Sequence, residues 1–412
     1  MPDPLNGKHV ILGVTGSIAA YKAADLASKL TQAGAHVDVL LTESAAKFVT
    51  PLTFRSLTHR AVVTDLFDAD SPEAIEHVAI ARRADALLVA PATANTMAKL
   101  ALGLADDVLT TTALAVTAPV MVAPAMDAGM WEHPTVQQHA ETLAGRGVHI
   151  AGPGAGRLAS GLMGRGRMLE PAELLERLRW VLAQDGDLQG RRIVVTAGGT
   201  QEPIDPVRVV TNRSSGKMGY AVAQAARDRG ADVTLVTATS ALTAPFGVAA
   251  RRVSTVADMR EAVLDACSEA DALVMAAAVS DYRPATVAGS KIKKTGEKAG
   301  DRLSLDMEKT NDFFLEVPEG VLRVGFAAET EDLIENARYK LASKSMALIV
   351  ANDVTKEGSG FEVDTNQVTI IGADGVTDEL PLLTKYEVGD KILDRVVSLL
   401  TNRDRQHMSH SL

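Results

Sequence analysis

Two segments of this chain share one pattern: an apolar strand, a turn of small and polar residues, and then a helix. In the second half, the apolar run 193–195 leads into Thr-Ala-Gly-Gly-Thr at 196–200, and Asn-Arg-Ser-Ser-Gly-Lys at 212–217 opens a helical pattern. Residues 10–20, with the sequence VILGVTGSIAA, begin the first half in the same way. Such a turn presents backbone N–H groups and the positive end of a helix dipole to an anion. The sequence therefore predicts two phosphate-binding sites, and hence two nucleotide sites, on one chain.

The length of 412 residues is enough for two domains, and strands and helices alternate in both halves. The first half has apolar runs at 9–14, 37–41, 86–90, 120–123 and 148–150, with helical patterns at 18–33 and 173–184. The second half has strands at 193–197, 233–237, 272–277, 322–326 and 347–351, helices at 218–229 and 257–268, and an expected edge strand at 367–372. Continuous apolar strands between helices indicate parallel sheets covered on both faces. The predicted fold class is α/β, with two doubly wound, Rossmann-like domains.

Segments without apolar periodicity divide the chain. The Gly- and Asp-rich segment 185–190 predicts a boundary between a domain at 1–188 and a domain at 189–402, followed by a polar, frayed tail at 403–412. Residues 286–301, rich in Lys and Gly, are expected to form a long mobile loop, and loops of this length are usually functional or disordered.

Composition excludes several classes of protein. The net charge of −10 argues against general nucleic-acid binding, which needs a basic surface. The single cysteine, Cys267, excludes a disulfide framework and a cysteine-based metal cluster, and it fits a reducing compartment. Apolar runs are too short for a membrane span, and the first one has neither the basic start nor the cleavage site of a signal peptide. We expect a cytoplasmic protein that binds small molecules and neither nucleic acid nor membrane.

The first turn differs from a dinucleotide fingerprint. Gly13-Val14-Thr15-Gly16-Ser17 is not G-x-G-x-x-G, and the second strand runs into Thr42-Glu43-Ser44 rather than ending in a ribose-binding carboxylate. This favours a mononucleotide phosphate and argues against a two-domain NAD dehydrogenase. The alternative is an ordinary strand-to-helix connection.

Polar residues also follow later strands of the first half, where open α/β sheets bind ligands. Ala-Pro-Ala-Thr-Ala-Asn-Thr occupies 90–96, and Pro-Ala-Met-Asp at 124–127 is followed by Met130-Trp131. Their simpler interpretations are a helix N-cap and an ordinary turn. His77, in an expected helix at 71–79, has an imidazole suited to general base catalysis, although a histidine on a helix often has no chemical role.

Together these motifs resemble a known family. GxTGSIAAYK, a histidine before the third strand, PATANTMAKLALGLADD, PAMxxxMW and a Gly-rich segment ending in GRGRM resemble flavin-containing cysteine decarboxylases with a flavodoxin-like domain. DPVRxxTNRSSGKMG, AAAVSDYRP, KIKK, GFAAET and AND extend the resemblance over about residues 8 to 400, in the family's order. The whole chain resembles the bifunctional coenzyme A biosynthesis flavoproteins, in which phosphopantothenoylcysteine decarboxylase is fused to phosphopantothenate–cysteine ligase.

For the first half the resemblance implies an FMN site and a catalytic base. His77 matches the base in oxidation of the cysteinyl group of the substrate. The residues implied in FMN binding are Gly16, Ser17, Ser44, Thr93, Asn95 and Thr96.

Two positions depart from the family pattern. Asp127 stands where the family has an asparagine that holds the substrate carboxylate, and it would repel that group unless protonated, turned aside or paired with a cation. Ser160 stands where a cysteine is the proton donor, and its hydroxyl is a far weaker acid than a thiol. The proton donor is therefore another group or water, or reduction of the intermediate is impaired.

For the second half the resemblance implies a ligase that activates 4'-phosphopantothenate with CTP through an acyl-cytidylate, with Mg²⁺ as counter-ion of the phosphates. Asn212 matches the residue that turns over the acyl intermediate, and Lys291 would contact the triphosphate. The other implied nucleotide-binding residues are Asp281, Lys309, Thr310, Asn311, Asp312, Phe326, Lys340 and Lys344. Simpler interpretations are a solvated loop for KIKK, a turn residue for Asn212, and a helix surface for Lys340 and Lys344.

Three alternatives remain at this point: a working ligase on an inactive flavin scaffold, a regulatory binding protein, and the less fitting NAD dehydrogenase. The resemblance also implies a homo-oligomer, expected to be a dodecamer built from trimers and dimers.

Overall fold

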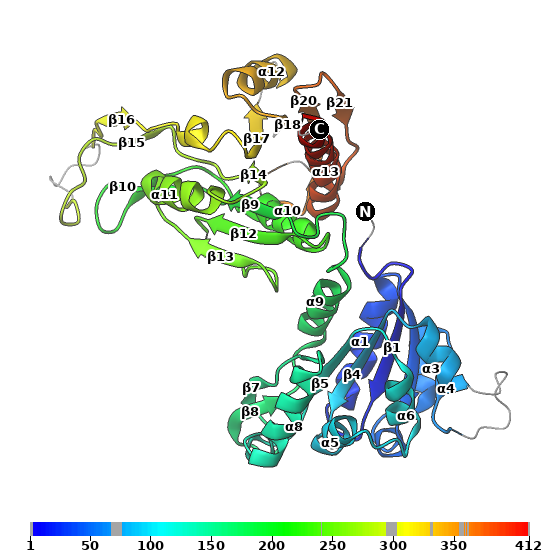
Figure 1. Cartoon of the computed structure of the whole chain (residues 1–412). Coiled ribbons are helices and arrows are strands. Elements are labelled where there is room, and N and C mark those ends of the chain that lie inside the picture. Colours follow the sequence, from blue (N-terminus) through cyan, green and yellow to red (C-terminus); the bar gives the residue numbers. More distant parts are fainter. Residues whose placement is uncertain are drawn as a thin grey trace. The chain divides into compact units, whose positions relative to one another are not determined.

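The computed structural model describes residues 3–66, 76–239, 241–293, 303–329, 333–353, 358, 360 and 362–410. The chain divides into two compact units, one of residues 2–183 and one of residues 184–412 together with residue 1 (Figure 1). Residues 71–75 of the expected His77 helix, residues 294–301 of the expected loop and residues 411–412 of the expected tail lie outside the described residues. The described part of that loop, 286–293, contains neither helix nor strand.

The first unit contains a six-stranded parallel sheet in the order β3-β2-β1-β4-β5-β6. Its strands are β1 (His9–Val14), β2 (His36–Leu41), β3 (Val62–Val63), β4 (Ala86–Ala92), β5 (Val120–Pro124) and β6 (His149–Ile150), and β7 (Gly154–Arg157) pairs with β8 (Met163–Arg167) in a separate hairpin. Its helices are α1 (Ala20–Gln32), α2 (Glu43–Ala46), α3 (Pro51–Thr58), α4 (Glu76–Arg83), α5 (Ala94–Leu102), α6 (Val108–Ala115), α7 (Ala128–Trp131), α8 (Pro134–Gly145) and α9 (Pro171–Leu182). This strand order is Rossmann-like, and without the two-residue β3 it becomes the flavodoxin-like order.

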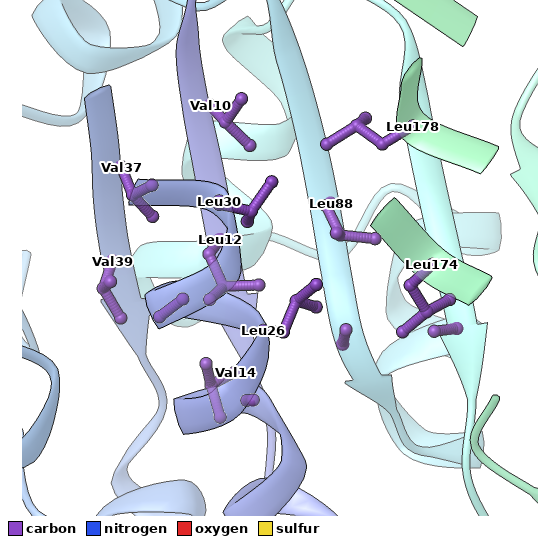
Figure 2. Packing of buried hydrophobic residues seen from close by; sticks show 14 of the residues in the cluster. Val10, Leu12, Val14, Leu26, Leu30, Val37, Val39, Leu88, Leu174 and Leu178 are labelled. Carbon is purple, nitrogen blue, oxygen red and sulfur yellow. The ribbon is translucent and has the colours of Figure 1, made fainter. Parts of the chain in front are cut away.

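Alternating side chains of each strand enter two different cores, which explains why the apolar runs are continuous. Figure 2 shows Val10, Leu12 and Val14 of β1 on the face of the sheet covered by α1, with Leu26 of α1 beside them. Leu178 of α9 belongs to the same core, farther across the sheet beyond Leu88 of β4. Ile11, between them in sequence, belongs to the core on the other face of the sheet. A strand buried on both faces has apolar residues at most positions, and the buried Asp38 of β2 is paired with Arg60 and Arg83. The strands β1, β2 and β4 were therefore predictable to within two residues.

The second unit repeats the arrangement with a larger sheet in the order β13-β12-β9-β14-β17-β18-β20-β21. Its strands are β9 (Arg192–Ala197), β12 (Asp232–Thr237), β13 (Ala249–Arg252), β14 (Ala272–Met275), β17 (Leu322–Glu329), β18 (Leu348–Asp353), β20 (Val368–Gly372) and β21 (Thr377–Glu379). Three short antiparallel pairs accompany it: β10 (Gln201–Pro203) with β11 (Val209–Thr211), β15 (Tyr282–Pro284) with β16 (Met307–Lys309), and β19 (Thr365–Asn366) with β22 (Leu383–Thr384). Its helices are α10 (Lys217–Arg227), α11 (Val256–Cys267), α12 (Leu333–Ser343), α13 (Lys385–His410) and a short 3-10 helix, Phe313–Glu316. Both units are thus doubly wound, as the sequence predicted.

Three expectations for the second half differ from the structure. The edge-strand prediction for 367–372 is wrong, because β21 pairs antiparallel with β20 and takes the edge. Residues 403–410 of the predicted frayed tail continue α13. The segment 184–188 belongs to the second unit rather than to the first, because Leu188 is fully buried in the second core and its N–H donates to the Arg229 carbonyl at 2.9 Å.

Asp107 starts α6 and gives a pH-dependent prediction for the first unit. Its carboxylate accepts from the Thr110 N–H at 2.9 Å and from Lys99 Nζ at 3.0 Å. Burial alone would raise the pKa of Asp107, but these hydrogen bonds outweigh it and hold the pKa below its usual value. The stabilisation is therefore fully present above the unfolded pKa of about 3.9 and is lost as the pH falls through the lower folded pKa.

We expect Asp107→Ala to destabilise the first unit by about 1 kcal/mol at pH 7, the typical cost of a lost N-cap. Trp131 and Trp180, the two tryptophans of the chain, both lie in the first unit, so urea unfolding followed by their fluorescence measures the effect. Asp107→Asn keeps a capping oxygen and is the control. A loss in the alanine variant that stays the same at pH 3 would contradict the assignment.

Candidate active sites

In the first unit, the turns that follow β1, β2 and β4 lie against one another. Thr15 Oγ1 donates to the Pro91 carbonyl at 2.7 Å and accepts from the Thr93 N–H at 3.2 Å. A Cβ atom added to Gly16 would lie 2.5 Å from Ser44 Cβ, so the β1 turn can approach α2 only with glycine at this position. The structure therefore brings Gly16, Ser44 and Thr93 together at the point where the strand order reverses, as expected for a ligand site of an open α/β sheet.

Thr93 is the N-cap of α5, which was the simpler interpretation of this motif. Its Oγ1 accepts from the Thr96 N–H at 3.3 Å and lies 3.1 Å from Thr96 Oγ1. Thr96 is buried, whereas Asn95 is exposed. Both hydroxyl groups are thus partly committed to the helix, and the Asn95 side chain faces solvent.

Asp127 and Ser160, the two departures from the family pattern, contact each other. Ser160 Oγ donates to Asp127 Oδ2 at 2.6 Å, and the Gly129 N–H donates to Asp127 Oδ1 at 3.1 Å as Asp127 caps α7. Two hydrogen bonds lower the pKa of Asp127, and the one from Ser160 has a larger effect than the one from Gly129. Asp127 is therefore an ionised carboxylate turned towards its own helix, which removes the protonated alternative.

The same pair borders a cavity of about 560 Å³ in the first unit. Ser17 lies on its wall beside Tyr21, and the β7–β8 hairpin supplies Arg157 and Arg167. Of the residues assigned to the first site, Ser17, Asp127 and Ser160 thus share one cavity.

His77 lies apart from these contacts. It is half-buried in the first turn of α4, and no hydrogen bond or ion pair joins it to another residue in the part of the chain that the structure describes. Its role as base therefore stays a prediction.

In the second unit, a cavity of about 470 Å³ lies at the carboxyl ends of β14 and β17, next to the N-terminus of α10. Gly216 caps α10 with a φ of 81°, and a Cβ atom there would lie 2.8 Å from Thr239 Cγ2. Eight residues predicted from sequence line this cavity: Asp281, Lys309, Thr310, Asn311, Asp312, Phe326, Lys340 and Lys344.

Hydrogen bonds fix the segment between β14 and Asp281. The buried hydroxyl groups of Thr200 and Ser280 lie 3.1 Å apart, and the Ser280 N–H donates to Thr200 Oγ1 at 2.9 Å. Thr310 Oγ1 donates to the Ser280 carbonyl at 2.5 Å, and the Thr310 N–H donates to the Asp281 carbonyl at 2.9 Å. These bonds set the register of Asp281 against the segment 309–312.

Lysine side chains make the cavity wall positive. Lys344 Nζ pairs with the Asp312 carboxylate at 2.9 Å and lies 6.0 Å from the centre of the Phe314 ring. Lys309, on β16, is exposed at the wall and has no ion pair among the described residues. An anion would therefore meet this amine, together with the backbone N–H groups at the start of α10.

Asn212 does not line the cavity, but its side chain is hydrogen-bonded to residues that do. Its Nδ2 donates to the Ala278 carbonyl at 3.3 Å and to the Val279 carbonyl at 3.2 Å, and both of these residues line the cavity. Two carbonyl oxygens can only accept, so the amide orientation is fixed. The Oδ1 atom makes no hydrogen bond within the described ranges, and the side chain is exposed.

Lys291 is not among the cavity residues. It is exposed, and its neighbour Ile292 is held by an N–H donated to Asp205 Oδ2 at 3.1 Å. Lys294, the last residue of KIKK, lies outside the described residues.

Comparison with known proteins follows the division into two units. The family model described as "Flavoprotein" matches residues 1–182, and the model described as "DNA/pantothenate metabolism flavoprotein C-terminal domain" matches residues 188–400. The coenzyme A biosynthesis bifunctional protein CoaBC of Bacillus subtilis (strain 168) is 46% identical over 401 residues, covering 96% of this chain and 98% of that protein. The chain belongs to the CoaBC family. The CoaBC protein of Mycobacterium tuberculosis (strain CDC 1551 / Oshkosh) is 43% identical over 415 residues, covering 95% and 97%.

Among solved structures, the crystal structure of the C-terminal domain of a CoaBC protein is 40% identical, with a TM-score of 0.45, and the match covers 53% of this chain and 99% of that one. Membership of the family makes the protein a bifunctional enzyme of coenzyme A biosynthesis, with a flavoprotein decarboxylase domain and a C-terminal ligase domain. No helix among the described residues is both long enough and apolar enough to cross a membrane.

Several residues that line these CoaBC cavities were not predicted. Lys217 and Asn352 lie in motifs that carried the resemblance, SSGKMG and AND, so their position directly after a turn or a strand was a usable signal. Asn366 and Lys385 have no such signal, because they follow no buried strand. The missed lining residues with charged or amide side chains are Lys22, Arg157, Arg167, Lys217, Asn352, Asn366 and Lys385.

Proposed function

We propose that the ligase half uses CTP to couple 4'-phosphopantothenate to cysteine, and that the decarboxylase half uses FMN to convert phosphopantothenoylcysteine into 4'-phosphopantetheine and CO₂. One observation carries the ligase assignment: Lys309, Lys340 and Lys344 share a cavity with the N-terminus of α10. Lysine ammonium groups and the backbone N–H groups of a helix N-terminus stabilise the negative charge of a triphosphate.

The ligase reaction has two displacements. A carboxylate oxygen of phosphopantothenate attacks the α-phosphorus of CTP, and pyrophosphate leaves. The amine nitrogen of cysteine then attacks the acyl carbon, loses a proton, and CMP leaves. Lys309, Lys340 and Lys344 would offset the charge that accumulates in the first step, and Lys291 is proposed to contact the triphosphate from the segment beside Asp205.

The nucleotide-binding role extends to Thr310, Asn311, Asp312 and Phe326, which line the same cavity. Mg²⁺ is proposed as counter-ion of the phosphates. Asp281 fits as its protein ligand, because it is the exposed carboxylate of the lining that has no ion pair among the described residues, whereas Asp312 pairs with Lys344.

The residues of the first unit fit an FMN phosphate. The close approach of Gly16 to Ser44 places the backbone of the first turn beside the Ser44 hydroxyl group. Ser17, Thr93 and the buried Thr96 carry further hydroxyl groups, and Asn95 is exposed next to them. When bound, FMN would supply the reversible hydride chemistry that oxidation of the cysteinyl group and the later reduction require. His77 is proposed as the base that takes a proton from the cysteinyl group.

Ser160 is a poor candidate for the proton donor of the last step. Its hydroxyl already donates to Asp127 at 2.6 Å, and the carboxylate it meets is ionised. We propose that water supplies this proton and that the Ser160–Asp127 pair has a positioning role.

An absorbance spectrum of the purified protein, followed by mass spectrometry of a reaction containing CTP, phosphopantothenate and cysteine, tests both halves. We expect a flavin spectrum and 4'-phosphopantetheine as product. A yellow protein that stops at phosphopantothenoylcysteine would establish a ligase on an inactive flavin scaffold. A colourless protein that makes neither product would refute the proposed function.

The proposed assembly is a homo-oligomer, built from trimers of the first unit and dimers of the second. Exposed apolar side chains support it, with Tyr21 at 62% exposed in the first unit and Val207 at 64% in the second. The buried free thiol of Cys267 supports a cytoplasmic setting.

A further inference from the structure

The carboxylate of Asp127 creates a recognition problem in the decarboxylase cavity. The substrate of the proposed reaction carries the carboxylate that will be lost, and Asp127 lines the cavity as a second anion. Both oxygens of Asp127 already accept hydrogen bonds, from Ser160 and from Gly129, and no cation is paired with it within the described residues. Asp127 can therefore only repel a substrate carboxylate.

Three cations line the same cavity, and two of them share one carboxylate, that of Glu170, as their ion-pair partner. Lys22 Nζ lies 2.8 Å from Glu170 Oε1, and Arg167 Nη2 lies 2.7 Å from the same oxygen. Lys22 also donates to the Met168 carbonyl at 3.2 Å and is buried. Arg157 makes no ion pair with any residue that the structure describes, and its side chain is exposed at the wall.

The Ser160–Asp127 hydrogen bond bears on the placement of Arg157. Arg157 is the last residue of β7, and Ser160 lies three residues later in the connection to β8. The bond to Asp127 therefore fixes the tip of this hairpin against α7, at the end from which Arg157 projects.

We propose that Arg157 binds the carboxylate of the substrate, so that carboxylate recognition lies on the β7–β8 hairpin rather than on residue 127. The planar guanidinium can donate two parallel hydrogen bonds to a carboxylate, which gives orientation as well as charge. This inference rests on the proposed function of the first unit.

The test compares two ligands that differ by this one group. Phosphopantothenoylcysteine carries the carboxylate, and 4'-phosphopantetheine lacks it. The calorimetric titrations use the full-length, flavin-loaded protein with His77→Asn in every variant, because loss of the proposed base prevents turnover of the first ligand. In this background, Arg157→Gln should weaken binding of the first ligand by about 10- to 100-fold and leave the second unchanged. Asp127→Asn should strengthen binding of the first ligand by about 2- to 5-fold, also without effect on the second.

Arg165→Gln is the matched control, because Arg165 lies exposed on the same hairpin but does not line the cavity. Arg157→Lys keeps the charge and should recover part of the affinity. The flavin spectrum and the ligase rate report that each variant is folded. Equal weakening of both ligands in Arg157→Gln, or no weakening of either, would overturn the assignment. Failure of the unaltered protein to bind phosphopantothenoylcysteine would instead overturn the proposed function and the inference with it.

Discussion

Replacing Asn212 by alanine is expected to stop the ligase after its first half-reaction. The two Nδ2 hydrogens of Asn212 are used by the Ala278 and Val279 carbonyls, which leaves Oδ1 as an acceptor beside the cavity. An acceptor can orient the N–H groups of the cysteine amine, but it cannot stabilise negative charge on the acyl oxygen. The residue is therefore expected to act on the nucleophile of the second step.

The expected size is a fall of about 10²- to 10³-fold in formation of phosphopantothenoylcysteine, comparable with loss of one well-placed polar group in an active site. Pyrophosphate release in a single turnover should stay near the unaltered rate, because activation by CTP precedes the use of cysteine. Rapid-quench mass spectrometry should then find the acyl-cytidylate accumulating.

Val210→Ala, in the neighbouring strand β11 (Val209–Thr211), is the control and should change both half-reactions by no more than about twofold. If Asn212→Ala slows pyrophosphate release as much as product formation, Asn212 acts in the first step or organises the cavity as a whole, and the acceptor role is wrong.

Replacing Arg229 by alanine is expected to destabilise the second unit by about 3–5 kcal/mol, the usual cost of removing one partner from a buried ion pair. Arg229 is 3% exposed and makes a bidentate contact with Asp187 at 2.9 and 2.6 Å. Its Nη1 also donates to Asp390 at 3.1 Å and to Asp394 at 2.9 Å. Burial alone would lower the pKa of Arg229, but the three carboxylates raise it. Without the guanidinium, the largely buried carboxylate of Asp390 and the partly exposed carboxylates of Asp187 and Asp394 would lose their counter-charge.

This network joins three parts of the second unit: the segment before β9, the end of α10 and the helix α13. Thermal inactivation of the ligase measures the loss, and tryptophan fluorescence, which reports only the first unit, should be unchanged. Arg192→Ala removes an ion pair between two exposed side chains, Arg192 and Glu269, and should cost less than about 1 kcal/mol. Equal losses of stability in the Arg229→Ala and Arg192→Ala variants would show that burial of the Arg229 network contributes nothing to the stability of the second unit.

The elements that were predictable from sequence are those buried on both sides. The long central strands are mostly apolar, because each lies between two helical layers, and most are followed by glycine or hydroxyl residues. The three-residue strands β10, β11, β15 and β16 were not predictable, since such short segments show no periodicity and form only where a partner strand lies beside them. The edge assignment of 367–372 failed for the same reason, because β21 gives almost no signal of its own.

The candidate sites divide in a similar way. Residues a few positions after a predicted strand, such as Asp281 and Thr93, could be proposed from sequence because the carboxyl ends of parallel strands meet at one edge of a sheet. Lys385 and Asn366 could not, because they reach the ligase cavity from segments far along the chain.

The sequence by itself determined the family, the two doubly wound units and the residue types available to each site, because these depend on local pattern and on the order of motifs. Only the tertiary structure decided how the unusual residues act. Asp127 and Ser160 are 33 positions apart, and no local pattern joins them. Yet their hydrogen bond favours the ionised form of Asp127 and engages the hydroxyl proton of Ser160. Lys22 likewise pairs with Glu170, 148 positions further along the chain, whereas Arg157 makes no ion pair among the described residues. Such pairings depend on distances across the fold, which the order of residues along the chain does not contain.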